Sequence, residues 1–120
     1  MTDDLFDGLL QVPTREDIAP GAVLLRAFAR DIDLALLQAA DAVTARSPLH
    51  HMQTPGGYTM SVASTSCGPL GWVSGPDGYR YAAHDPRTGQ PWPAMPACFS
   101  ELAQWAAARA GYANFVPDAC

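Results

Sequence analysis

The segment from Pro91 to Pro96, PWPAMP, limits the fold of this chain more than any other stretch. Proline lacks the backbone N–H and clashes with the preceding helical turn, so the segment can be neither a helix interior nor a central strand. It therefore divides the chain into two unlike regions. Residues 58–81 before it carry strand-forming side chains, and residues 97–110 after it carry a helical pattern.

Two helices are predicted from apolar residues that recur at helical spacing. The first runs from about residue 32 to residue 45, with Asp31 as its N-cap and Ser47, which is followed by proline, at its end. The second covers residues 97–110, and Gly111 is well placed as the residue that caps its C-terminus.

The predicted strands are short and are separated by glycine- and proline-containing turns. They cover residues 22–28, 58–65, 72–73 and 78–81, with turns at 74–77 and 85–89 and an extended segment at 114–120. These pieces do not make the long alternating set that closes a sandwich or a barrel. The chain is therefore expected to be α+β, with residues 1–20 as an irregular N-terminal arm.

Composition places the chain among small globular domains. It has 120 residues, is 48% hydrophobic and 16% charged, and carries a net charge of −5. All basic residues are arginine, and the acidic balance weighs against a purely electrostatic nucleic-acid binder. Three dispersed cysteines without a CxxC motif predict free thiols in a reducing cytosol. No secretory signal or membrane span is recognisable, so we expect a soluble, cytoplasmic protein without a membrane partner.

The sequence shows no complete catalytic or metal site. His50 and His51 are adjacent and would point to opposite sides of an extended segment, and His84 precedes Asp85 directly. A site with two histidines and one carboxylate needs ligands that converge, so the expected catalytic and metal-ligand sets are empty. The histidines are better explained as solvated or locally hydrogen-bonded residues.

Binding chemistry is better represented. Tyr58, Trp72, Tyr79 and Tyr81 lie close together in the sequence among glycines and hydroxyl residues. Aromatic faces stack on nucleobases, and each such contact contributes about 1–3 kcal/mol. The same residues could instead fill the core of a small sheet, which is the commoner use of aromatic side chains in strands.

The charge-free segment TPGGYTMSVASTSCGPLGW, residues 54–72, closely resembles the N-terminal half of the bacterial AlkB proteins. The resemblance continues through GYRY, DPRTGQPWPAMP and the final NFVPDAC, and covers about residues 21–120. Members of this family are dioxygenases that use Fe(II) and 2-oxoglutarate to repair alkylated DNA and RNA. Their substrate bases, such as 1-methyladenine and 3-methylcytosine, lose an N-methyl group by oxidation.

The resemblance implies a fold and a role for this region. Residues 21–120 would be the nucleotide-recognition lid and flanking helices of a double-stranded β-helix (jelly-roll) dioxygenase, with the catalytic barrel strands largely missing from this chain. Trp72 would stack on the flipped base, Tyr79 would hydrogen-bond a phosphate, and Tyr81 would support the pocket. The residues that would line the approach to the base are Thr54, Tyr58, Met60 and Ser61.

Departures from the family pattern bear on substrate and activity. Ser64, Ser66 and Pro69 stand where the family pattern has methionine, asparagine and histidine, so the preferred lesion is open. The family's iron and 2-oxoglutarate ligands lie after the position that matches Cys120, which implies that this chain alone binds neither cofactor and is inactive. The expected partner is single-stranded or alkylated DNA or RNA, and the protein is expected to be monomeric. Two alternatives remain: a non-catalytic module that binds single-stranded nucleic acid, and an inactive remnant.

Overall fold

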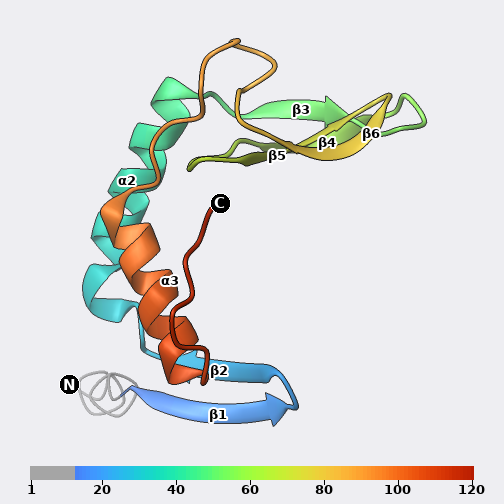
Figure 1. Ribbon diagram of the computed structural model, residues 1–120. Coiled ribbons are helices and arrows are strands. Elements are labelled where there is room, and N and C mark those ends of the chain that lie inside the picture. The colour runs from blue at the N-terminus through green and yellow to red at the C-terminus, as the bar shows by residue number, and fades with distance from the viewer. Residues whose placement is uncertain (1–12) are drawn as a thin grey trace, which may run out of the picture.

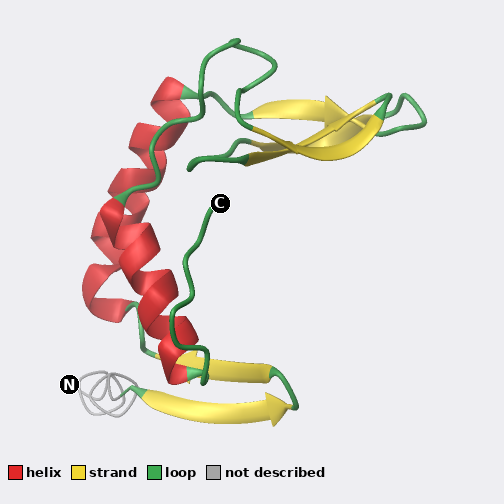
Figure 2. Cartoon of the chain, viewed as in Figure 1, coloured by secondary structure: helices red, strands yellow, loops and turns green. Residues whose placement is uncertain are grey.

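The computed structural model describes residues 13–120, and Figures 1 and 2 show its helices with strands at both ends. The helices α2 (Asp33–Arg46) and α3 (Ala97–Arg109) lie side by side. A hairpin of β1 (Thr14–Ala19) and β2 (Ala22–Arg26) lies at one end. Two further hairpins lie at the other end, so the predicted mixed α and β content is confirmed.

The larger strand-bearing end consists of two antiparallel pairs. The first pairs β3 (His50–Gln53) with β4 (Thr59–Ser64), and the second pairs β5 (Gly71–Gly75) with β6 (Gly78–Ala82). The two pairs contact each other through β3 and β5. The extended C-terminal segment runs back along α3 toward β5, where Leu70 and Ala119 form a parallel bridge.

Helix α3 agrees with its predicted bounds because its end signal is strong. Gly111 adopts a φ of +98°, which an L side chain would disfavour, and the Tyr112 N–H donates to the Ala107 carbonyl at 2.8 Å. The predicted end of α2 at Ser47 is also confirmed. The predicted start near residue 32 is confirmed within one residue, but the predicted N-cap was wrong. Asp31 lies in a short 3-10 helix η1 (Arg30–Ile32), and the N-cap is Ile32, followed by Asp33, whose carboxylate accepts the Leu34 N–H.

Two strands were missed. The stretch from residue 14 to residue 19 was expected to be irregular, but it forms β1, and the remainder of the predicted arm up to residue 12 lies outside the described residues. The other is β3, which pairs His50 with Ser64 and His51 with Ala63. Both strands are polar and short, and they are extended because a partner strand lies beside them.

The molecule is open, and its core is small. The radius of gyration is 17.5 Å, whereas a compact chain of this length would have about 13.6 Å. Within residues 13–120, the buried apolar side chains all lie in the half of the molecule that holds the end of α2 and the strands β3 to β6: Val43, Met52, Cys67, Val73 and Trp92. Among the described residues, no helix is long and apolar enough to cross a membrane.

Candidate functional site

An aromatic surface forms on the hairpin of β5 and β6. Register places Trp72 opposite Tyr81, and the indole of Trp72 stacks on the ring of Tyr79, with centroids 5.5 Å apart and planes 25° from parallel. Tyr79 and Tyr81 are 66% and 63% exposed, and Trp72 is half-buried. The three rings are therefore open to solvent instead of filling the core. We call Trp72, Tyr79 and Tyr81 the aromatic face.

The aromatic face is supported by burial along β5. Val73 and Ser74 are each 5% exposed. Ser74 donates its hydroxyl to the Gln53 carbonyl at 2.7 Å and its N–H to Met52 Sδ at 3.3 Å, which fixes β5 against β3. The strand that carries Trp72 is thus held by a neighbouring hairpin, while its ring remains accessible.

Trp92 clamps the end of the hairpin next to the aromatic face. It is 5% exposed, and its indole N–H donates to the Ala82 carbonyl at 2.8 Å. Ala82 pairs with Gly71, and a Cβ built on Gly71 would lie 2.5 Å from Trp92 Nε1. The ring therefore occupies the space that any side chain at Gly71 would need, one residue before Trp72.

The buried carboxylate of Asp85 holds the loop of residues 85–90, which precedes Trp92. Asp85 is 1% exposed, and its carboxylate accepts the Ser47 hydroxyl at 2.7 Å and the Arg87 N–H at 2.9 Å. Thr65 donates to the Ser47 hydroxyl at 2.9 Å, so the end of α2, the end of β4 and the 85–90 loop meet at one point. The Asp85 N–H also closes the loop on the Gln90 carbonyl at 2.9 Å.

Sequence reasoning missed Trp92 and Asp85 as supports of this surface. A tryptophan between two prolines cannot lie inside a helix, and it therefore has to find a partner for its indole N–H elsewhere. Asp-Pro-Arg-Thr-Gly is a turn in which an aspartate can accept the N–H two residues on. The sequence shows both patterns, but neither predicts which strand the loop packs against.

The remaining predicted residues lie on the hairpin of β3 and β4. Thr54 closes the turn: its hydroxyl accepts the Tyr58 N–H at 3.2 Å, and its N–H donates to the Tyr58 carbonyl at 2.7 Å. Tyr58 is 77% exposed at the tip of the turn. On β4, Ser61 is exposed and Met60 is half-buried. The predicted set is therefore split between two neighbouring hairpins.

The histidines do not converge on a metal site. His50 is half-buried and His51 is exposed, and His51 Nδ1 lies 2.8 Å from the Met60 carbonyl, which is the local hydrogen bonding that was expected. His84 forms a bridge with Pro91. In residues 13–120, no three His, Cys, Asp or Glu side chains are grouped so that they could hold a metal ion.

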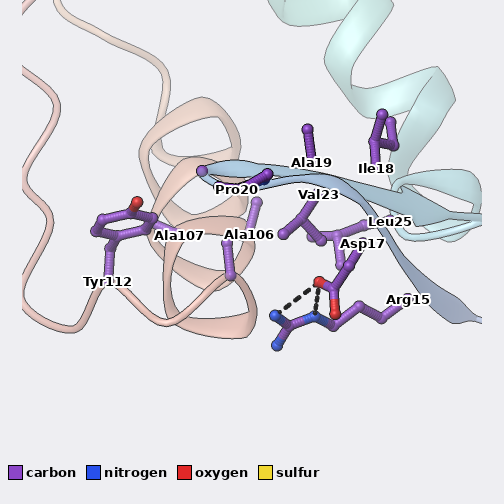
Figure 3. Close-up of a pocket in the computed structure, with 12 residues that line it drawn as sticks. Arg15, Asp17, Ile18, Ala19, Pro20, Val23, Leu25, Ala106, Ala107 and Tyr112 are labelled. Carbon is purple, nitrogen blue, oxygen red and sulfur yellow. Dashed lines mark hydrogen bonds and ion pairs between the residues drawn. The ribbon is translucent and has the colours of Figure 1, made fainter.

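One cavity lies away from the aromatic face. It has a volume of about 810 Å³ and lies between the hairpin of β1 and β2 and the C-terminal end of α3 (Figure 3). Arg15 pairs with Asp17 at 3.0 Å and donates to the Arg109 carbonyl at 2.8 Å, and much of the remaining lining is apolar. The two charged side chains that line the cavity are thus paired with each other, and we assign no chemistry to it.

The chain has relatives among known proteins. Residues 21–120 match the family model of the 2OG-Fe(II) oxygenase superfamily. The chain is 52% identical over 117 residues to the alpha-ketoglutarate-dependent dioxygenase AlkB of Salmonella typhimurium, an alignment that covers 98% of this chain and 53% of that protein. It is also 52% identical over 108 residues to AlkB of Escherichia coli, with 90% and 50% covered.

A more distant relative is the AlkB homolog of Caulobacter vibrioides, which is 38% identical over 104 residues, with 87% of this chain and 43% of that protein covered. The chain thus spans about half the length of the curated relatives that it matches. On the family match and these identities, the chain belongs to the 2OG-Fe(II) oxygenase superfamily and, within it, to the AlkB-family dioxygenases.

Proposed function

We propose that these residues are the base-holding part of a dioxygenase that repairs alkylated DNA or RNA by oxidative demethylation. The substrates would be bases such as 1-methyladenine and 3-methylcytosine. The observation that carries the proposal is the stacked pair of Trp72 and Tyr79, in which Trp72 is half-buried and Tyr79 is exposed. A ring pair that is already stacked at the surface can accept a third flat ring at little cost in side-chain ordering.

In this proposal, the aromatic face binds and orients the base. Trp72 stacks on it, Tyr79 reaches a neighbouring phosphate through its hydroxyl, and Tyr81 flanks the pocket. Thr54, Tyr58, Met60 and Ser61 line the approach from the adjoining hairpin. An alkylated base is easier to extrude than a normal one because its pairing is already weakened, which favours damaged substrates.

The lid is proposed to cover a jelly-roll domain that carries the reaction centre. Family membership implies Fe(II) and 2-oxoglutarate, which when bound supply the oxidation of the N-methyl group. The described residues do not fit the iron, because no suitable group of ligands converges in them. Their part is therefore to hold the base and the backbone, and no step at the metal is assigned to them.

The test is a fluorescence titration with single-stranded oligonucleotides that differ only by one 1-methyladenine. Saturable quenching of tryptophan emission is expected, with tighter binding of the methylated strand. Trp72→Ala should raise Kd roughly 5- to 150-fold, the loss of one stacking contact. Trp105→Phe is the matched control, because Trp105 is exposed on α3, outside the aromatic face. Equal Kd values for the Trp72→Ala variant and the parent chain would refute the proposal.

A non-catalytic module for single-stranded nucleic acid would use the same aromatic face, and it is kept as the second candidate because one hairpin of these residues supplies all three rings. The two candidates differ in the fate of the methyl group. Mass spectrometry of the methylated oligonucleotide, incubated with the protein from the complete reading frame, Fe(II) and 2-oxoglutarate, separates them. Loss of the methyl group supports the dioxygenase, and binding without loss supports the module.

A further inference from the structure

Cys67 and Cys120 are far apart in the sequence but are paired through their backbones. The Cys67 N–H donates to the Cys120 carbonyl at 2.8 Å, and the Cys120 N–H donates to the Cys67 carbonyl at 3.1 Å. Two such reciprocal bonds close the same ring that a hydrogen-bonded residue pair of an antiparallel ladder forms, in which the Cα atoms lie about 5.5 Å apart, although the next bridge between these segments, Leu70 with Ala119, is parallel. Disulfides most often join Cα atoms roughly 5.5–6 Å apart. The backbone therefore holds the two cysteines at the separation that a disulfide requires.

Further contacts adjoin the pairing, so it is not an isolated contact. The Leu70 N–H donates to the Asp118 carbonyl at 3.0 Å, and Leu70 bridges Ala119. The Gly68 N–H donates to the Pro93 carbonyl at 2.8 Å, which ties the same loop to the segment that carries Trp92. The C-terminal segment is thereby registered against residues 67–70.

The two thiols differ in exposure. Cys67 is 2% exposed, whereas Cys120 is exposed. Burial, followed by the charge and the hydrogen bond of the Cys120 side chain, raises the pKa of the Cys67 thiol to about 12. Cys67 is therefore protonated at neutral pH, and Cys120 is the thiol that a reagent in solution meets first.

We propose that Cys67 and Cys120 form a redox-sensitive modification site that closes to an intramolecular disulfide when a small-molecule disulfide such as glutathione disulfide is the oxidant. The Cys120 thiolate attacks one sulfur of the oxidant, a mixed disulfide forms, and one glutathione leaves as a thiolate. Cys67 then gives its proton to a released glutathione thiolate and attacks the Cys120 sulfur, which breaks the mixed disulfide bond and releases the second glutathione as a thiolate that takes up a proton from water. Two protein thiols are oxidised, and one disulfide is reduced to two thiols.

The cross-link would act on the candidate site through the chain. Residues 67–70 lead directly into β5, which begins at Gly71 and carries Trp72. A covalent bond at Cys67 fixes this entry to the C-terminal segment, in addition to the backbone hydrogen bonds. This inference does not depend on the proposed function, because the thiols form no part of the aromatic face.

Tryptic mapping tests the pairing without ambiguity. Cleavage after Arg46, Arg80, Arg87 and Arg109 places Cys67, Cys98 and Cys120 on three different peptides. Oxidation with glutathione disulfide should remove two hydrogen atoms from the chain, and alkylation of the remaining thiol should then add one alkyl group. Peptides 47–80 and 110–120 should be joined, and Cys98 should be alkylated. A cross-link that includes Cys98, a disulfide between two chains, or a persistent glutathione adduct on Cys120 would each overturn the proposal.

A second measurement asks whether the fold brings the thiols together. The oxidation midpoint is titrated in glutathione buffers for the native chain and for the chain in urea. The equilibrium constant for disulfide formation should be roughly 30- to 1000-fold larger in the native chain than in urea. The logarithm of this ratio corresponds to the free energy by which the cross-link stabilises the fold. Equal midpoints would refute the inference. Cys120→Ser, at an exposed position, should abolish the cross-link, and Cys98→Ser is the matched control that should leave it unchanged.

Discussion

Substitution of Gly71 by alanine tests the packing of Trp92 against Gly71 and its hydrogen bond to Ala82, which together we call the Trp92 clamp. A Cβ at this position would lie 2.5 Å from Trp92 Nε1 and 2.7 Å from Ser66 Cβ, whereas nonbonded carbon atoms pack at about 3.5–4.0 Å. Obstacles stand on two sides, so relief requires the indole to move by about 1 Å. That movement strains or breaks the hydrogen bond from Trp92 to the Ala82 carbonyl.

The expected loss follows from two terms. Overpacking of a filled site costs about 1–3 kcal/mol, and a weakened buried hydrogen bond adds about 1 kcal/mol. Gly71→Ala should therefore lower the free energy of unfolding by about 2–4 kcal/mol. Urea denaturation followed by far-UV circular dichroism measures the change. Gly75→Ala is the matched control on the same strand, because a Cβ added there would have nothing within 4 Å and the residue's φ is ordinary; it should stay within about 0.5 kcal/mol of the parent.

A double-mutant cycle shows whether Trp92 is the obstacle. In a Trp92→Ala background, the methyl group that the Gly71→Ala substitution adds has room, so the substitution should cost much less than it does in the parent chain. A Gly71→Ala variant as stable as the Gly75→Ala control, or an undiminished cost in the Trp92→Ala background, would refute the reasoning.

Three further predictions concern Trp92, Asp85 and Cys67. Trp92→Phe retains a ring beside Gly71 but removes the hydrogen bond to Ala82, and it should lower the unfolding free energy by about 1–2 kcal/mol in urea melts. Asp85→Ala leaves the Ser47 hydroxyl and the Arg87 N–H without their acceptor, and it should cost about 3 kcal/mol, with exposed Asp77→Ala as the neutral control. The folded pKa of Cys67, about 12, lies above the ordinary 9.0, so the unfolded chain ionises first and stability should fall as pH rises between these values. Cys67→Ala should remove that part of the decline, and identical pH profiles would contradict it.

Elements with strong local signals could be predicted from the sequence. The glycine that ends α3 and the turn between β5 and β6 fix their neighbours through backbone conformation, which a sequence displays directly. By contrast, β1 is entirely exposed and its sequence, TREDIA, is mostly polar. Its extended form depends on pairing with β2, including the side-chain contact of Arg26 with Glu16 at 2.9 Å, and no local pattern announces such a partner.

The candidate site also contains residues that could be predicted from the sequence and residues that could not. Its exposed aromatic residues could be selected because their residue types carry the chemistry. The stacking of Trp72 on Tyr79 follows from their diagonal positions across one hairpin, once the turn is known. The roles of Trp92, Asp85 and the Cys67–Cys120 pair could not be predicted, because each depends on segments that meet only after the chain has folded.

The concentration of buried side chains at one end of the helices has a consequence for how the molecule opens. The hairpin of β1 and β2 shares no buried residue with the Trp92 clamp, and β1 has no side chain out of solvent. The two ends should therefore exchange amide hydrogens as separate cooperative units. Amides of β1 would exchange through openings that cost almost nothing, while those of β5 would exchange only when the whole clamp is released. Local opening of the hairpin of β1 and β2 can thus proceed without disturbing the aromatic face at the other end of the molecule.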